Sequence, residues 1–290
     1  MYREGLELRL AATDVSNHLA CRHLTELDRA VAEGRRAAPE FRDPMLAVLQ
    51  KRGLEHERAY LQHFRARGLR IVGPEKEGGK LSLEQVMGAM RAGADVIVQA
   101  ELRDGRWFGR ADVLLRVAGA SDLGAWSYEV VDTKLAQETR AETVLQLCQY
   151  SDLLAQVQGC APEMMHVVKP GADFHPDSFR FDDYGAYYRF VRRRLEAAMA
   201  GPPSASTYPD PVAHCGVCRW WAECDARRHA DDALCLVAGL RPLHTVELVR
   251  QGITTLGQYA REPKPLRETP QRGTPETFAR AHGQAQVQLE

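Results

Sequence analysis

The stretch that decides the fold is Gly109–Tyr150, GRADVLLRVAGASDLGAWSYEVVDTKLAQETRAETVLQLCQY, which has an acid on one apolar run and Asp-Thr-Lys at the end of the next. With the residues just before it, the pattern predicts three strands and then a helix, at 94–102, 106–117, 126–134 and 139–158. Asp104-Gly105 is a strong two-residue hairpin signal between the first two strands. This order predicts an α/β protein whose sheet contains a crossover helix.

Other elements are expected around the sheet: helices at 13–34, 44–67, 82–92 and 184–200, and short strands at 163–168 and 178–182. The chain then divides into an N-terminal helical segment with Cys21 (1–43), an α/β core (44–200), a cysteine module (201–235), a helical pair (236–261) and a flexible tail with a possible helix at its end (262–290). The helical pair turns at Gln251-Gly252-Ile253 and faintly resembles a helix-hairpin-helix that binds the DNA backbone. Simple structural packing is the alternative.

The composition excludes several classes of protein. Apolar residues make up 44% of the 290 residues and charged residues 27%, as in ordinary globular proteins. A net charge of −1 argues against holding nucleic acid by bulk electrostatics, although a single basic groove remains compatible with it. No apolar run approaches the roughly 20 residues of a membrane helix, and a signal peptide's apolar core is lacking, so we expect a cytoplasmic protein without a membrane partner. No nucleotide-binding glycine motif is present.

The third predicted strand carries the chemistry. Asp132 and Lys134 are two residues apart and therefore point to the same face, whereas Glu129 points to the other. Asp112 lies on the neighbouring strand and can approach Asp132. Two carboxylates that converge at a strand end repel each other unless a divalent cation such as Mg²⁺ or Mn²⁺ lies between them, and the lysine can then orient an attacking water. Solvated charges at a strand end are the alternative, and the Asp-x-Lys-like triplet Glu262-Pro263-Lys264 lacks any strand context.

Two further features accompany the carboxylates. Gln146 and Tyr150 are four apart on the following helix and share a face, where the glutamine needs a partner such as the lysine or a DNA phosphate; purely structural roles are the alternative. On the helix at 44–67, the apolar seam directs His56 inward, which by itself is typical of a satisfied core histidine, and His63 lies near the same seam.

These residues resemble a known family. GRAD, the strand-terminal DTK and QLCQY resemble the PD-(D/E)xK nuclease superfamily in its RecB-type branch, and Gly53-Leu54-Glu55-His56 is similar to that branch's Gly-x-x-His motif. The resemblance implies a restriction-endonuclease-like core of helix, three-stranded mixed sheet, helix and strand. It also implies a metal on His56, Asp112, Asp132 and the carbonyl of Thr133, with Lys134 at the water and Gln146 and Tyr150 near DNA.

Seven cysteines in such a chain do not suggest a disulfide framework, but Cys215-x2-Cys218-x5-Cys224 is a compact cluster of three thiols. Metals held by cysteine usually take four ligands. Cysteines that could supply the fourth are Cys21, Cys148, Cys160 and Cys235, and a nearby histidine is a further choice; Cys148 and Cys160 follow apolar patterns, and Cys235 fits a helix interior. The set resembles that of iron–sulfur nucleases, including AddB-like subunits and CRISPR adaptation exonucleases, which implies a [4Fe-4S] cluster on Cys21, Cys215, Cys218 and Cys224. Structural zinc on the same cysteines or His214, or a loop of free thiols, is the alternative.

From these features we expect a metal-dependent deoxyribonuclease, acting as an exonuclease on single-stranded DNA or on DNA with single-stranded ends, in repair, recombination or processing. The resemblance also implies a helicase or an RNase H-like module as a partner, in this or another chain. One alternative is a catalytically inactive nuclease fold that binds DNA for a partner. Another is a zinc-dependent structural module.

Overall fold

The computed structural model describes residues 1–40, 44–76, 78–171, 173–202 and 207–290. The chain forms two compact units, Met1–Ala205 and Ser206–Glu290, each with a hydrophobic core of its own. The predicted segments 1–43 and 44–200 therefore belong to one unit, and the later segments belong to the other.

The first unit is built on a mixed sheet that has eight strands among the described residues. These are β1 (Tyr2–Glu4), β2 (Glu7–Ala11), β3 (Ile71–Val72), β4 (Val96–Asp104), β5 (Trp107–Ser121), β6 (Gly124–Thr133), β7 (Met164–Val168) and β8 (Pro176–Arg180). The antiparallel strands β4, β5 and β6 form its centre, and β7 pairs with β6 in parallel through a crossover helix. The predicted hairpin is confirmed, but its two-residue turn is Gly105-Arg106 instead of Asp104-Gly105, because Asp104 still belongs to β4 and pairs with Trp107.

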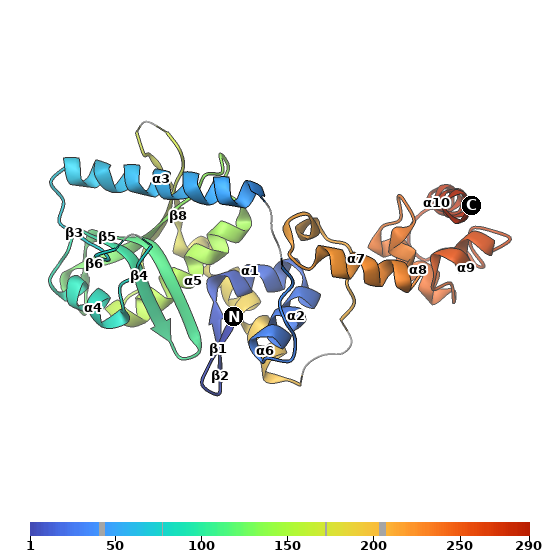
Figure 1. Cartoon of the computed structure of the whole chain (residues 1–290), viewed down its shortest axis with the longest axis horizontal. Coiled ribbons are helices and arrows are strands. Elements are labelled where there is room, and N and C mark those ends of the chain that lie inside the picture. Colours follow the sequence, from blue (N-terminus) through green and yellow to red (C-terminus); the bar gives the residue numbers. More distant parts are fainter. Residues whose placement is uncertain (41–43, 77, 172, 203–206) are drawn as a thin grey trace. The chain divides into compact units, whose positions relative to one another are not determined.

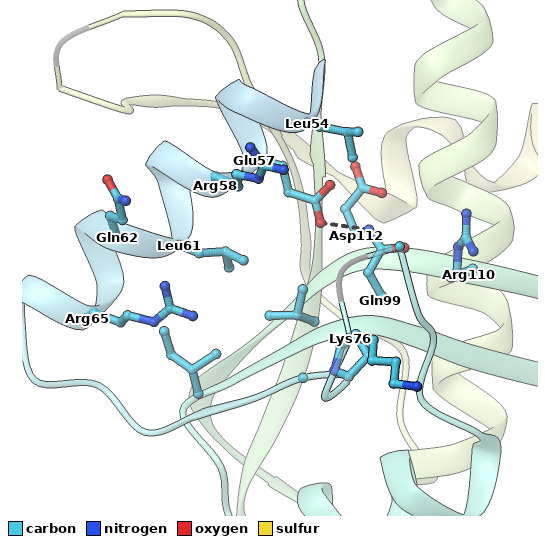
Figure 2. Close-up of a pocket in the computed structure, with 15 residues that line it drawn as sticks. Leu54, Glu57, Arg58, Leu61, Gln62, Arg65, Lys76, Gln99, Arg110 and Asp112 are labelled. Carbon is cyan, nitrogen blue, oxygen red and sulfur yellow. Dashed lines mark hydrogen bonds between the residues drawn. The ribbon is translucent and has the colours of Figure 1, made fainter. Parts of the chain in front are cut away.

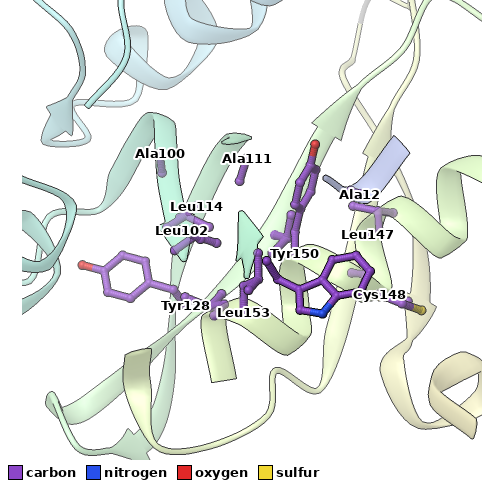
Figure 3. Packing of buried hydrophobic residues seen from close by; sticks show 14 of the residues in the cluster. Ala12, Ala100, Leu102, Ala111, Leu114, Tyr128, Leu147, Cys148, Tyr150 and Leu153 are labelled. Carbon is purple, nitrogen blue, oxygen red and sulfur yellow. The ribbon is translucent and has the colours of Figure 1, made fainter. Parts of the chain in front are cut away.

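Helices cover both faces of this sheet (Figure 1). They are α1 (Ala12–Ala20), α2 (Arg22–Ala32), α3 (Pro44–Ala66), α4 (Leu83–Arg91), α5 (Ala141–Gln158) and α6 (Phe181–Ala200). On one face, Tyr60 and Phe64 of α3 pack against strand valines. On the other face, α1, α4, α5 and α6 contribute to the larger cluster, part of which Figure 3 shows around Tyr128, Leu147 and Leu153. The result is a mixed α/β fold with helices on both sides of the sheet.

Near the N-terminus the structure differs from the sequence prediction. The helix predicted at 13–34 is two helices, broken at Cys21, whose backbone is extended and whose Sγ accepts the Leu24 N–H at 3.4 Å as the cap of α2. Residues 2–11 form β1 and β2 rather than part of a helical segment. β2 forms a short hairpin with β1, and it joins the main sheet by pairing with the first residues of β5, which lie far away in sequence. Such a short, non-local pairing leaves little periodicity in the sequence.

The centre of the sheet contains an irregularity at Gln99, which has a left-handed φ of +53° within β4. Before it, Val98 packs on the α3 side of the sheet, and after it, Ala100 packs on the α5 side. The same irregularity occurs in the partner strand β5, where Ala111 faces the α5 side and Val113, two residues later, faces the α3 side. The pairing register of the two strands is the same before and after this point. Gln99 and Asp112 lie opposite each other at this point, which we call the face switch.

The second unit is helical in the part that the structure describes. It contains α7 (Trp221–Ala230), α8 (Pro242–Arg250), α9 (Leu256–Arg261), α10 (Pro275–Leu289) and 3-10 turns at Ala213–Val217 and Leu234–Leu236. The predicted helical pair corresponds to α8 and α9, which are joined through Gly252 with φ +77°. A DNA-binding role for this pair stays a prediction.

The helix that the sequence suggests at the end of the predicted flexible tail, 262–290, is present and is packed against the rest of the second unit. Residues 275–289 form α10, which begins after a capping Thr274 and buries Phe278, Ala281 and Ala285 in the core of the second unit. The Tyr259 hydroxyl donates a hydrogen bond to the Phe278 carbonyl at 2.8 Å. The buried stripe consists of one aromatic ring and small residues, so it gives a weak apolar signal in a Pro- and charge-rich segment.

Among the described residues, no helix combines the length and the apolar character that crossing a membrane requires.

Gly109 of β5 provides a test of the packing between sheet and helix. A Cβ atom at this position would lie 2.7 Å from ring carbons of Tyr150 and 3.2 Å from Leu153 Cδ1. We expect Gly109→Ala to lower the free energy of unfolding by about 1–3 kcal/mol in urea titrations, because the close-packed α5 must shift. The control is Gly88→Ala in α4, where nothing lies within 4 Å and the change should be neutral or stabilising. Equal stability of the two variants would contradict this packing.

Candidate active site

The structure brings five of the predicted site residues together around one cavity of about 440 Å³. These are Asp112 from β5, Asp132 from β6, Lys134 just after β6, and Gln146 and Tyr150 from α5. Val113 of β5 pairs with Val131 of β6 in an antiparallel register. The next position along this register therefore brings Asp112 opposite Asp132. Strand pairing and helical spacing therefore suffice to gather these side chains.

Asp132 is the most buried charged group of this set, with 2% of its surface exposed. Lys134 Nζ lies 2.8 Å from its Oδ2, an ion-pair distance, but the geometry is not that of a hydrogen bond. That oxygen therefore has no hydrogen-bond partner among the described residues. Burial, and next the charge of Asp112, raise the pKa of Asp132 to about 7, although Lys134 opposes the shift. Asp132 is therefore easier to protonate than an ordinary carboxyl group, and a bound cation would oppose that protonation.

Asp112 is fixed to the end of the neighbouring strand. Its Oδ2 accepts hydrogen bonds from both the backbone N–H and the hydroxyl of Thr133, each at 3.0 Å. These bonds hold the carboxylate of Asp112 beside β6 and close to Asp132. Thr133, whose carbonyl was predicted to bind metal, therefore also positions a carboxylate.

Gln146 and Tyr150 form a hydrogen-bonded pair at the cavity wall. Gln146 Nε2 donates to the Tyr150 hydroxyl at 2.8 Å, and the Tyr150 ring lies directly on Gly109. Figure 3 shows Tyr150 among buried neighbours such as Leu153. Burial raises the pKa of Tyr150 to about 12, with further contributions from the two aspartates, so its hydroxyl keeps its proton at any physiological pH.

A second cavity, of about 730 Å³, lies between α3 and the sheet, and Asp112 and Arg110 line both cavities (Figure 2). Within it, Gln99 Nε2 donates to Glu57 Oε1 at 2.7 Å. Burial raises the pKa of Glu57, the hydrogen bond from Gln99 lowers it, and the charge of Asp112 raises it further, so these two carboxylates lie near each other.

The sequence prediction missed Glu57, Gln99 and Arg110. Glu57 directly follows His56, but it lies off the apolar seam that drew attention to the histidine. Gln99 and Arg110 occupy ordinary positions in predicted strands, and the role of their side chains depends on the face switch. The helical spacing of Leu54, Glu57 and Leu61 was the available signal for a second lining stripe on α3.

His56, predicted as a metal ligand, is not among the described residues that line the carboxylate cavity. Its Nε2 lies 3.1 Å from the backbone carbonyl of Val168, and Phe174 stacks on its ring at a centroid distance of 6.0 Å. The same carbonyl accepts the Lys134 N–H, so the histidine lies beside the end of β6. In this arrangement His56 matches the alternative of a satisfied histidine, and binding a metal through Nε2 would require it to leave Val168.

The predicted cluster ligands belong to different units. Cys21 lies between α1 and α2 of the first unit, whereas Cys215, Cys218 and Cys224 are half-buried thiols of the second. Trp220, which lies between Cys218 and Cys224 in the sequence, is buried, and Trp221 is exposed. The interpretation of Cys148 as a buried apolar residue is confirmed, and burial raises its pKa to about 12. Cys160 is only half-buried, and Cys235 lies in a 3-10 turn rather than in an α-helix.

The donor set at the carboxylates suits a hard divalent cation. In the part of the chain that the structure describes, no three His, Cys, Asp or Glu side chains are gathered closely enough to hold a metal ion as they stand. Mg²⁺, however, is commonly bound by one or two carboxylates together with waters and substrate phosphates. The buried carboxylate of Asp132 beside Asp112 fits that mode, because its Oδ2 has an ion pair with Lys134 but no hydrogen-bond partner among the described residues, and a cation would offset the repulsion between the two carboxylates.

No model of a known protein family matches the chain, and no curated protein matches it. Among solved structures, the chain is similar to the crystal structure of SSO0001, with 14% sequence identity and a TM-score of 0.34, covering 77% of this chain and 87% of that one. A likeness at this level says nothing about activity. The functional proposals therefore rest on the residues of the site.

The raised pKa of Asp132 predicts a pH-dependent effect of its removal. An ionised Asp132 costs free energy in the folded state above its unfolded pKa near 3.8, and the full cost applies above a pH of about 7. We expect Asp132→Asn to stabilise the metal-free protein on the order of 2 kcal/mol more at pH 8 than at pH 4. Urea unfolding in the presence of a chelator measures this difference, with Asp183→Asn, an exposed carboxylate on α6, as the control. A pH-independent effect would contradict the raised pKa.

Proposed function

We propose that the protein is a metal-dependent nuclease that hydrolyses phosphodiester bonds in DNA, with a restriction-endonuclease-like core of the RecB type. The observation that carries this proposal is the buried Oδ2 of Asp132, which lacks a hydrogen-bond partner among the described residues and lies beside both Asp112 and Lys134. A purely structural salt bridge would have no need of a second carboxylate in so buried a place. A cavity of about 440 Å³ gives a substrate phosphate access to these groups.

The carboxylates of Asp112 and Asp132 would hold Mg²⁺ or Mn²⁺, with Thr133 fixing Asp112 in place. The bound cation supplies Lewis-acid stabilisation of the phosphoryl oxygens and lowers the pKa of a water. His56 and the Thr133 carbonyl stay predicted as further ligands, and Glu57, which interacts with Asp112, is a second source of negative charge.

Other side chains of the cavity are suited to bind and orient the substrate. Lys134 is one-third exposed, so its ammonium can reach an attacking water or a phosphoryl oxygen while it stays near Asp132. Tyr150 keeps its proton and, with Gln146, offers neutral hydrogen bonds to the sugar–phosphate backbone. Arg110 is exposed and lines both cavities, where its guanidinium can form a charge-assisted hydrogen bond to a phosphate.

Cleavage of end-labelled single- and double-stranded DNA with Mg²⁺ or Mn²⁺ tests the proposal. We expect Asp132→Asn and Lys134→Ala each to lower the cleavage rate by about 10²–10³-fold, because the first removes a carboxylate that would hold the cation and the second removes a positive charge that would stabilise the reacting phosphate. Products that shorten steadily from one labelled end would identify an exonuclease.

The matched control is Glu129→Gln. Glu129 lies on the same strand as Asp132, but it bonds to His166 and the Met164 N–H instead of lining the cavity. Its variant should cleave like the parent. Full cleavage by both the Asp132 and Lys134 variants would refute the site.

The position of His56 favours a second candidate function, a nuclease-like fold that binds DNA for a partner without cutting it. Its Nε2 is engaged by the Val168 carbonyl, as in a structural histidine. Protein that binds single strands but cuts no DNA with any divalent metal, including Mn²⁺, would establish this alternative. A helicase or an RNase H-like module is the partner that we propose in either case.

The iron–sulfur cluster is proposed from the spacing of Cys21, Cys215, Cys218 and Cys224, with structural zinc as the alternative. Anaerobically purified protein should absorb at about 400 nm through iron–thiolate charge transfer and should contain iron and sulfide. We expect Cys218→Ser to lose this band, while Cys148→Ser keeps it, because Cys148 is buried in the core of the first unit. Colourless protein that contains zinc and no iron would refute the cluster.

A further inference from the structure

The larger cavity combines basic and apolar side chains in a way that the carboxylate site does not explain. One stripe of α3 lines it with the residues Leu54, Glu57, Arg58, Leu61, Gln62 and Arg65, which follow helical spacing. Figure 2 shows this stripe extending along the helix from Glu57 to Arg65. The opposite wall comes from Ile71, Val98 and the loop that follows β3, including Lys76.

The larger cavity is lined by more positively charged than negatively charged side chains. Arg58, Arg65, Lys76 and Arg110 line it, whereas its acids are Glu57 and Asp112. In a chain of net charge −1, this excess of cations over anions in one cavity is a local feature rather than a reflection of composition. The cation that acts on Glu57 is Arg110, whereas Arg65 and Lys76 add positive charge to other parts of the lining.

We propose that this cavity is a subsite for single-stranded nucleic acid, on the α3 side of the phosphodiester bond that is cut. The phosphates would lie at Arg65, Lys76 and Arg58, and a sugar or an unstacked base would lie against Leu61, Ile71 and Val98. The proposal rests on the nuclease function proposed above and names the part of the substrate that the site recognises.

The size and lining of the cavity favour a single strand over a duplex. A volume of about 730 Å³ lies within the range of pockets for small ligands, roughly 300–1,000 Å³, which corresponds to about one or two nucleotides. Apolar side chains inside such a cavity can contact a base only when the base is unstacked. A paired and stacked duplex would present phosphates at the rim and leave this apolar surface unused.

The face switch connects this subsite to the chemistry. Because β4 and β5 change sides at Gln99 and Asp112, the side chain of Asp112 borders the cavity on each face of the sheet. When the scissile phosphate of a bound nucleic-acid strand lies at Asp112, the nucleotide on one side of it therefore lies beside Tyr150 and Lys134. The nucleotide on the other side lies beside Arg65 and Lys76. Arg110, which also borders both cavities, is placed to hold the phosphate between them.

The test measures binding of the full chain to a fluorescent oligothymidylate by anisotropy, in EDTA, so that no cleavage occurs. The double variant Arg65→Ala, Lys76→Ala should bind about tenfold more weakly at low salt. The slope of log Kd against the logarithm of the salt concentration should also be smaller by about 1.4, since each phosphate contact with a single strand contributes about 0.7 to that slope. With Mn²⁺, the same variant should raise KM for cleavage and leave kcat nearly unchanged, as expected when uniform binding is lost.

The matched control is the double variant Arg91→Ala, Arg193→Ala. It removes the same charge from exposed positions on α4 and α6 that do not line either cavity, and it should bind within twofold of the parent. Because both variants lose two positive charges, a difference between them cannot come from net charge.

Each outcome bears on a separate proposal. If the Arg65 and Lys76 variant binds and cleaves like the parent, the subsite is refuted while the nuclease function stands. If that variant loses binding but the parent never cleaves with any metal, the nuclease function fails while the subsite stands. A blunt duplex that binds as tightly as the single strand and is weakened equally by the variant would refute the single-strand assignment.

Discussion

The carboxylate of Asp132 is buried next to a second carboxylate, and the arrangement of the first unit depends on how that cost is offset. An ionised carboxylate taken out of water without compensation costs on the order of several kcal/mol. Lys134 provides a nearby positive charge, and Thr133 ties Asp112 to the strand end with two hydrogen bonds. The raised pKa lets Asp132 keep a proton when no cation is present. The segment Asp132–Lys134 thus contributes a carboxylate, an ammonium group and the hydrogen bonds to Asp112 at one place in the cavity.

Much of the fold could be predicted from the sequence because its central elements are local. The Asp104-Gly105 pair marks the hairpin of β4 and β5, whose turn is Gly105-Arg106, and α5 shows both a helical pattern and a glycine end at Gly159. The elements that escaped prediction or gave a weak signal are short or rely on small residues. β2 is a five-residue strand that pairs with β1 and with the distant start of β5, and α10 buries Phe278 among alanines.

The same distinction applies to the site. Period-two alternation places Asp132 and Lys134 on one side, and four-residue spacing aligns Gln146 with Tyr150, so these residues could be found without a structure. Glu57 and Arg110 could not, because their place at the site depends on the change of faces at Gln99. His56 shows the converse: its inward direction was predictable, but its hydrogen bond to Val168, 112 residues away, was not.

The left-handed Gln99 also constrains how this chain can vary over evolutionary time. β4 and β5 change sides at the same level and keep their register, so an insertion or deletion in one strand alone would turn its remaining core residues outward. A compensating change in the other strand would be needed at the same level. The hairpin 96–115 is therefore expected to vary in length only at its turn, while the two strands are inherited as a matched pair.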